Sequence, residues 1–189
     1  RDRIQSHFED SYDNLEISYI VQEPQLGTGH ALLQAESHLG DSFIALNGDR
    51  VIDAAVIDAV INRRKETTNP VMAITRIERP SRYGVVELEG QTVVGLEEQP
   101  HPDRTKSDYI NAGVYAFGPE IFAAIRRIET HGEQALTDAL DTFIDDQRLE
   151  AVRYQGTWLD VSEPWDLLTV NTALLGTERS SNTIPENAT

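Results

Sequence analysis

The chain has 189 residues, 39% of them hydrophobic, which suits one globular domain with its own core. Its formal net charge of −16 argues against a nucleic-acid partner, because neutralising phosphates needs clustered Lys and Arg. No apolar run approaches the roughly 18–20 residues of a membrane span, and no signal-peptide pattern appears, so we expect a cytoplasmic protein with no membrane partner. With no cysteine and five scattered histidines, any metal must be held mainly by oxygen.

The basic residues are unusual, because of the 16 present only Lys65 and Lys106 are lysines. Arginine use in so acidic a chain indicates adaptation to a high-salt cytoplasm, with an acidic mesophilic protein as the alternative. A stability optimum in dilute buffer rather than in molar salt would exclude the halophilic interpretation.

The first half of the chain alternates strand and helix signals. Residues 15–22 alternate in polarity and are rich in β-branched and aromatic types, which predicts a strand. Residues 26–39 show helical spacing, 42–49 form a short apolar strand, and Asp53 can cap a helix over the next segment. Strand, helix, strand, helix is typical of a parallel α/β sheet.

The second half continues with a strand over 70–77 and a hairpin over 83–100 that turns at 89–91. A strand over 110–117 precedes a helix that begins with Pro119 and a helix capped by Thr137. A strand and turn over 149–161 and a helix over 163–176 that ends at Gly176 complete the domain. The sequence therefore predicts a Rossmann-like α/β fold: a mixed, mostly parallel sheet flanked by helices, with a small antiparallel insertion.

Both ends of the sequence look cut. The chain starts with Arg1 instead of Met, and residues 177–189 have the Ser, Asn, Thr and Pro content of a linker. We expect one domain over residues 1–176, incomplete at its N-terminus, followed by a linker.

Several polar residues fall where strands lead into helices, the position at which open α/β sheets bind ligands. Gln22 ends the first predicted strand, and Gly27 and Thr28 precede the next helix. Thr28 as a plain helix N-cap is the competing interpretation. His30 is better interpreted as a residue of the helix's first turn than as a base or ligand.

Two aspartates form a more specific signal. Asp49 follows a buried strand and Asp160 lies at the "WLDV" turn. Mg²⁺ takes one or two carboxylates together with substrate phosphates, so the pair could hold one metal. Alternatively, Asp49 caps the turn into Asp53 and Asp160 caps the last helix region.

Glu98 and Asn111 lie at strand ends on the later part of the chain. A carboxylate and an amide beside one crevice could receive the hydroxyls of a sugar. Solvated strand-end side chains are the alternative.

Six motifs in order, "QEPQLGTGHA", "LNGD", "YGVV", "LEEQP", "INAGVY" and "WLDV", resemble the sugar-1-phosphate nucleotidylyltransferase family over residues 22–175. The resemblance implies reaction of a nucleoside triphosphate with a sugar 1-phosphate to give a nucleotide sugar and pyrophosphate. The sugar phosphate oxygen would attack the α-phosphorus in line, without a covalent enzyme intermediate.

The resemblance also implies roles for particular residues. Those contacting the nucleobase are Gln22, Gly27 and Thr28. Those binding Mg²⁺ are Asp49 and Asp160, of which Asp49 also serves the nucleotide. Those lining the sugar-phosphate pocket are Gly84, Glu98, Gln99 and Asn111.

Two features depart from the family pattern. Gln99 stands where the family has a lysine that meets the sugar phosphate, and Arg104 is a candidate to supply the missing charge. The family's glycine-rich triphosphate loop would lie before Arg1. We therefore expect the 189 residues alone to be inactive.

We expect the full-length protein to be a Mg²⁺-dependent homo-oligomeric enzyme that uses UTP or dTTP. The tail "NTIPENAT", residues 182–189, resembles the entry to the left-handed β-helix of many members, and such a domain beyond Thr189 would make the protein bifunctional. The alternative is a non-catalytic regulatory subunit on the same fold. A metal-dependent glycosyltransferase is a weaker third hypothesis, because "NGD" is not the usual D-x-D.

Overall fold

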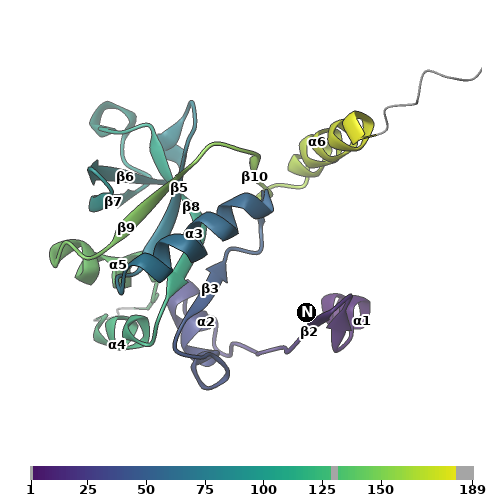
Figure 1. The fold of residues 1–189 in the computed structure, drawn as a ribbon, viewed down its shortest axis with the longest axis horizontal. Coiled ribbons are helices and arrows are strands. Elements are labelled where there is room, and N and C mark those ends of the chain that lie inside the picture. The colour runs from purple at the N-terminus through teal and green to yellow at the C-terminus, as the bar shows by residue number, and fades with distance from the viewer. Residues whose placement is uncertain (1, 129–131, 182–189) are drawn as a thin grey trace, which may run out of the picture. The chain divides into compact units, whose positions relative to one another are not determined.

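The structure is a computed structural model that describes residues 2–128 and 132–181, with side chains described up to residue 175 (Figure 1). The chain divides into two compact units, residues 1–42 with 118–142, and residues 43–117 with 143–189. The expected domain boundary at residue 176 stays a prediction. Within the described ranges, no helix has the length and apolar character needed to cross a membrane.

The first unit is built from short elements. They are α1 (Asp2–Phe8), β1 (Ser11–Tyr12), β2 (Leu15–Glu16), α2 (Thr28–Gln34), a 3-10 helix (Glu36–His38) and α4 (Glu120–Arg127). The helix α5 (Leu136–Asp145) begins in this unit, and its last three residues belong to the second.

The strand expected over residues 15–22 is wrong beyond Glu16. β2 pairs only with the two-residue β1, and residues 17–22 form no regular structure. A strand needs a neighbour for its N–H and C=O groups, and the apolar pattern alone does not supply one. Ile20 and Val21 are accordingly 40% and 41% exposed.

Two helix starts also differ from the prediction. Pro119 is the N-cap of α4 instead of its first residue. α5 begins at Leu136, so Thr137 lies inside its first turn and does not cap it. The first shift is of one residue and the second of two, within the usual uncertainty of helix boundaries.

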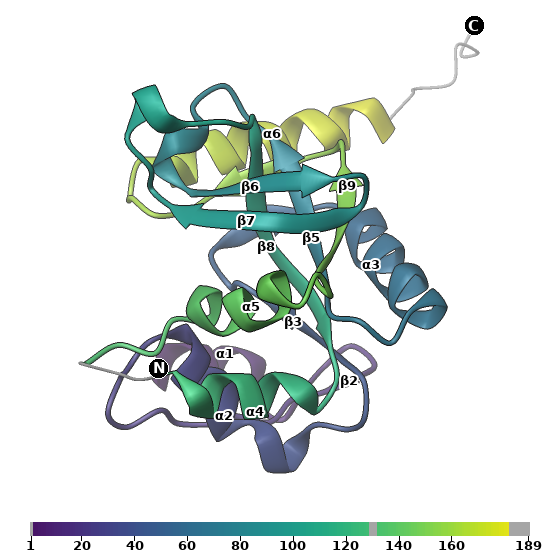
Figure 2. The same ribbon diagram turned by 90° about the vertical axis from the view of Figure 1, so that its left-hand side faces the viewer.

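The second unit holds most of the strands. They are β3 (Phe43–Leu46), β4 (Arg50–Ile52), β5 (Val71–Arg76), β6 (Gly84–Glu89), β7 (Thr92–Glu98), β8 (Tyr109–Phe117), β9 (Glu150–Tyr154) and β10 (Trp158–Asp160). The helices are α3 (Ala54–Glu66) and α6 (Asp166–Ser181), with 3-10 helices at Pro80–Arg82 and Pro102–Arg104. The predicted hairpin is confirmed, and Figure 2 shows its strands β6 and β7 side by side.

Six strands form one mixed sheet in the order β3-β8-β5-β9-β7-β6. The expected mixed α/β class is confirmed, but the sheet is not mostly parallel, because among the described strands only β5 and β9 pair in parallel. β3 and β5 have the common direction that a strand–helix–strand unit gives. β8 lies between them and pairs antiparallel with both.

Helix α3 covers the sheet of the second unit (Figure 1). Its Val56 and Val60 are fully buried against β5, β8 and Tyr154 of β9. The sequence missed β4, which pairs antiparallel with β10. It also ended the last helix too early, since α6 continues through Gly176 to Ser181, and an interior glycine costs a helix only about 1 kcal/mol. Residues 182–189 of the expected linker lie outside the described residues.

Candidate functional site

A pocket of about 710 Å³ opens in the second unit, within the size range of small-molecule sites. Its lining includes all four residues that the sequence assigned to the sugar phosphate, Gly84, Glu98, Gln99 and Asn111, together with Asp160. These residues come from β6, the end of β7, β8 and β10. The fold therefore gathers into one cavity residues that are up to 76 positions apart in the chain.

Gly84 is needed for the position of Glu98. The two residues are register partners in the β6–β7 ladder. A Cβ added to Gly84 would lie 2.9 Å from Oε1 of Glu98 and 3.2 Å from Cδ1 of Leu96, which is too close for a side chain. The glycine therefore lets the Glu98 carboxylate lie against the strand at the pocket wall.

Asn111 is held by hydrogen bonds of both its polar atoms. Its Nδ2 donates to the Tyr115 hydroxyl at 2.6 Å, and its Oδ1 accepts from the N–H of Gly113 at 3.0 Å. Burial raises the pKa of Tyr115 to about 12, although the Asn111 hydrogen bond lowers it, so the phenol stays protonated. The amide is thereby fixed in one orientation at the pocket wall.

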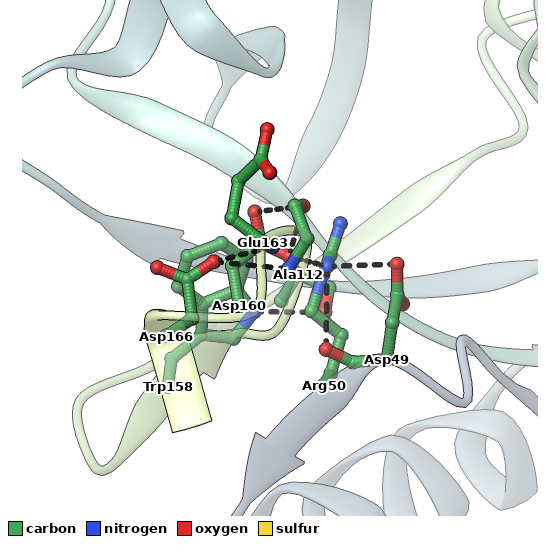
Figure 3. A network of polar contacts seen from close by, with 8 residues as sticks. Asp49, Arg50, Ala112, Trp158, Asp160, Glu163 and Asp166 are labelled. Atoms are coloured by element: carbon green, nitrogen blue, oxygen red, sulfur yellow. Dashed lines mark hydrogen bonds and ion pairs between the residues drawn. The ribbon is translucent and has the colours of Figure 1, made fainter. Parts of the chain in front are cut away.

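The two aspartates lie on either side of one arginine (Figure 3). Arg50 of β4 is the register partner of Asp160, and the N–H of Val161 donates to the carbonyl of Asp49 at 2.9 Å. Nη1 of Arg50 lies 3.1 Å from Oδ2 of Asp49 and also contacts Oδ1 of Asp160. The structure thus brings together the pair that the sequence proposed as metal ligands.

Asp160 does not cap the last helix, which was the alternative to a metal role. α6 begins at Asp166, whose own carboxylate accepts from the N–H groups of Ser162 and Glu163 at 3.1 and 2.8 Å. The Asp160 carboxylate instead accepts from Oγ of Ser162 at 2.8 Å and from Arg50. Its side chain is 15% exposed, against 51% for Asp49.

Sequence reasoning missed Arg50. Its side chain is only 13% exposed and its guanidinium lies 5.3 Å from the ring centroid of Trp158. Trp158 is itself fixed, because its Nε1 donates to the carbonyl of Ala112 at 2.9 Å. An arginine directly after an aspartate and before an apolar pair, as in "GDRVI", was the available signal.

Tyr83 closes the Asp160 side of the pocket. Its ring meets Trp158 edge to face at 5.2 Å. Burial is the main cause that raises the pKa of Tyr83, and the charge of Asp160 and a hydrogen bond to it raise it further. The protonated phenol is therefore a hydrogen-bond donor at this carboxylate.

The positive charge at the pocket does not come from Arg104. That side chain is 70% exposed, pairs with Glu97 at 3.2 Å and does not line the cavity. Gln99 does line it, with a positive φ of 45° and an N–H that donates to the carbonyl of Tyr83. Arg50 and Arg82 are the arginines of the lining.

The three residues expected to contact a nucleobase lie together in the first unit. Nε2 of Gln22 donates to the carbonyl of Gly27 at 2.9 Å and lies 2.9 Å from Nδ1 of His30. The Thr28 hydroxyl accepts from the N–H of Leu136 at 2.9 Å and does not cap α2. His30 does lie in the first turn of α2, as expected.

The aspartate pair has the donor set of a small divalent cation. Two carboxylates converge on one cationic nitrogen, and Mg²⁺ commonly uses one or two carboxylates and takes its other ligands from substrate and water. Within the described ranges, no cluster of three or more His, Cys, Asp or Glu side chains has metal-binding geometry.

Comparison with known proteins identifies the family. The model of the nucleotidyl transferase family matches residues 1–177. The chain belongs to the nucleotidyl transferase family. The resemblance inferred from the six motifs is confirmed.

Curated nucleotidyl transferase relatives are longer than this chain. The chain is 36% identical over 166 residues to the bifunctional protein GlmU of Methanococcus maripaludis strain C5, covering 86% of the chain and 39% of the relative. It is 38% identical over 169 residues to the glucose-1-phosphate thymidylyltransferase of Streptomyces antibioticus, covering 85% and 46%. The chain thus spans less than half the length of these relatives.

Solved nucleotidyl transferase structures share the fold. A UDP-glucose pyrophosphorylase complexed with UDP-glucose superposes with a TM-score of 0.80 at 22% identity, over 93% of this chain and 77% of that one. A putative glucose-1-phosphate thymidylyltransferase of Bacillus anthracis gives 0.79 at 20% identity, over 91% and 71%. At this identity the likeness supports the α/β fold.

Proposed function

We propose that the chain carries the sugar-phosphate and metal side of a sugar-1-phosphate nucleotidylyltransferase active site. The reaction joins the nucleotidyl group of UTP or dTTP to a sugar 1-phosphate and releases pyrophosphate. The main support is that one pocket holds Gly84, Glu98, Gln99 and Asn111 beside the Asp160 carboxylate. The names of the thymidylyltransferase and pyrophosphorylase relatives agree with this chemistry.

The sugar hydroxyls are met by Glu98 and Asn111. The carboxylate accepts hydrogen bonds and the fixed amide offers both donor and acceptor atoms, a combination that suits a polyol. Because the hydrogen bonds to Tyr115 and Gly113 hold Asn111 in place, little side-chain entropy is lost when the sugar binds.

The sugar phosphate needs a cation, and Gln99 supplies none. Arg82 lines the pocket and is exposed, and within the described part of the chain no carboxylate forms an ion pair with it. A guanidinium can bind a phosphate with two parallel hydrogen bonds. We therefore assign the phosphate contact to Arg82 instead of Arg104, with Gln99 as a neutral donor.

Asp49 and Asp160 would hold the divalent cation. When bound, such a cation neutralises phosphate charge in the ground state and the charge that develops during in-line transfer. The β4–β10 pairing places the Asp49 backbone beside the segment that carries Asp160, and the Tyr83 ring packs edge to face on Trp158.

The nucleobase contact belongs to Gln22, Gly27 and Thr28. Nε2 of Gln22 is engaged by Gly27 and His30, so Oε1 is the atom that we expect to accept a hydrogen bond from the base. The cytoplasmic location and the homo-oligomeric state stay predictions.

One observation favours the alternative, a non-catalytic regulatory subunit. Arg50 already neutralises both aspartates and occupies the position between them. The two functions are separated by pyrophosphate release from the full-length protein with a panel of sugar 1-phosphates, UTP and dTTP. The enzyme gives release that Mg²⁺ supports and EDTA abolishes, whereas the subunit gives none with any pair.

A further inference from the structure

Arg50 occupies the place between the two aspartates that a metal ion would need. A single nitrogen, Nη1, contacts the carboxylates of both Asp49 and Asp160. Figure 3 shows the guanidinium between them, with the Asp49 contact on one side and the Asp160 contact on the other. The pair of negative charges is therefore offset by a cation that belongs to the chain itself.

Arg50 is held at this position by Nη1, which donates to Asp160 and to the carbonyl of Asp49, while its Nε makes no such contact with the described residues. Its guanidinium packs over Trp158, yet its Nε is buried without a hydrogen-bond partner in the described part of the chain. A buried donor that lacks a partner is unfavourable, and moving the guanidinium into water or onto an anion removes that cost. One donor of the guanidinium is therefore left unsatisfied by the described residues at this position.

A divalent cation and the guanidinium cannot share the same carboxylate oxygens. Two positive groups at contact distance repel each other, and water screens them little on the Asp160 side, where the Arg50 and Asp160 side chains are 13% and 15% exposed; the Asp49 side chain is 51% exposed. Metal binding therefore requires Arg50 to move. Arg50 also lines the pocket, so an anion bound there is within reach of the displaced guanidinium.

We propose that Arg50 is an internal counter-ion that competes with divalent metal for Asp49 and Asp160, and that a sugar phosphate in the pocket relieves the competition by binding the displaced guanidinium. The competition between Arg50 and metal concerns only the residues of this chain and a divalent cation. The relief of that competition by a sugar phosphate rests on the proposed function. Metal and sugar phosphate then bind with positive coupling, each making the other tighter.

The competition is tested by Mn²⁺ affinity, measured by electron paramagnetic resonance on the full-length protein. Arg50→Met removes the competing charge and keeps the apolar stem over Trp158, and we expect Mn²⁺ to bind about tenfold tighter or more. Arg104→Met, which removes an arginine–glutamate pair outside the pocket, is the matched control and should leave the affinity unchanged. Arg50→Lys keeps a positive charge, so its Mn²⁺ affinity should lie between those of the wild type and Arg50→Met.

Thermal unfolding gives a second readout. Without metal, Arg50→Met leaves Asp49 and Asp160 repelling each other, so its melting temperature should lie below that of the wild type. Saturating Mn²⁺ should raise the melting temperature of Arg50→Met by more than it raises the melting temperature of the wild type. If the Met variant does not fold, Arg50→Gln gives the same comparison with a neutral donor.

Unchanged or weaker Mn²⁺ binding by the neutral Arg50 variants would overturn the competition. For the relief by a sugar phosphate, Mn²⁺ affinity is measured with and without glucose 1-phosphate. We expect glucose 1-phosphate to tighten Mn²⁺ binding by the wild type, and to tighten it less in Arg50→Met. An equal effect of glucose 1-phosphate on the two proteins would refute the coupling. Absence of pyrophosphate release would refute the proposed function while leaving the metal competition standing.

Discussion

The glycine turn of the first unit and the aspartate pair of the second differ in how their polar groups are satisfied. In the turn, Gln22 and Thr28 find neutral partners within their own unit, Gly27 and Leu136. At the pair, the carboxylates converge on a cation beside a pocket. A glycine-rich junction can thus be explained by packing alone, whereas two adjacent carboxylates require a positive charge.

The glycines of the turn have a structural cause. Gly27 has a φ of 103°, and a Cβ there would lie 2.7 Å from the carbonyl oxygen of Gln134. Gly29 donates its N–H to the same oxygen at 2.8 Å. The close approach of the 134 backbone therefore explains both glycines, and a ligand role for the turn needs separate evidence.

The largest effect is expected at the aspartate pair. Asp160→Asn removes a negative charge from the metal position with almost no change of shape, so pyrophosphate release by the full-length protein should fall about 100-fold or more. Asp58→Asn, on the exposed face of α3, is the control and should keep full activity. Activity retained in Asp160→Asn would mean that the pair holds no catalytic metal.

In the turn, Gly27→Ala should act on stability. The new Cβ clashes with backbone at 2.7 Å in a conformation that L residues rarely adopt, so we expect a loss of about 3 kcal/mol in the free energy of unfolding. Denaturant unfolding measures it, and Gly90→Ala is the comparison, because it has a positive φ of 66° but no close neighbour. Equal losses in the two variants would show that packing against Gln134 contributes nothing.

A buried carboxylate outside both regions sets a reference for acid sensitivity. Burial alone raises the pKa of Glu150, but hydrogen bonds from Asn69, Thr67 and Arg63 outweigh it and hold the pKa below its ordinary value of 4.5. Glu150→Gln should therefore cost about 2 kcal/mol at neutral pH. Glu66→Gln, which removes the exposed partner of Arg63, should cost much less.

The pH dependence at Glu150 has a definite sign. Because the folded pKa is lowered, the stabilisation is complete above pH 4.5 and is lost as the pH falls through the folded value. The stability difference between wild type and Glu150→Gln should therefore shrink in acid. A difference that stays constant from pH 6 to pH 3 would contradict the assignment.

The smallest effect is expected for Thr28→Val. It removes the acceptor of the Leu136 N–H at one exposed position, so we expect about 1 kcal/mol of destabilisation. If Thr28 also contacts the nucleobase, the KM for UTP or dTTP rises while the KM for the sugar phosphate does not. A lower stability with an unchanged nucleotide KM would leave the turn with a structural role alone.

Much of the second unit follows from local signals. The hairpin at Gly90 and the strand around Asn111 were predicted because alternation and turn residues agree with the tertiary pairing. The sugar-pocket residues were found because six motifs occur in a known order. The same signals did not show that β8 would separate β3 from β5, since strand order depends on pairing partners that lie far apart in the sequence.

The unpredicted features depend on contacts across the chain. Arg50 becomes the counter-ion of Asp160 only because β4 pairs with β10, a contact over 110 residues. Similarly, Asp53 is the N-cap residue of α3 as predicted, but its carboxylate makes no capping hydrogen bond and accepts from the Tyr154 hydroxyl and the N–H of Thr157. Neither partner is near in sequence.

Two adjacent glutamates test the central claim, that the pocket of the second unit binds the sugar phosphate. Glu98 lines the pocket, whereas its neighbour Glu97 pairs with Arg104 outside it. The measurement is the KM for the sugar 1-phosphate in Glu98→Gln and Glu97→Gln of the full-length protein. The account predicts an increase of about tenfold or more for Glu98→Gln alone, with the nucleotide KM unchanged. Equal KM values in the two variants would contradict it.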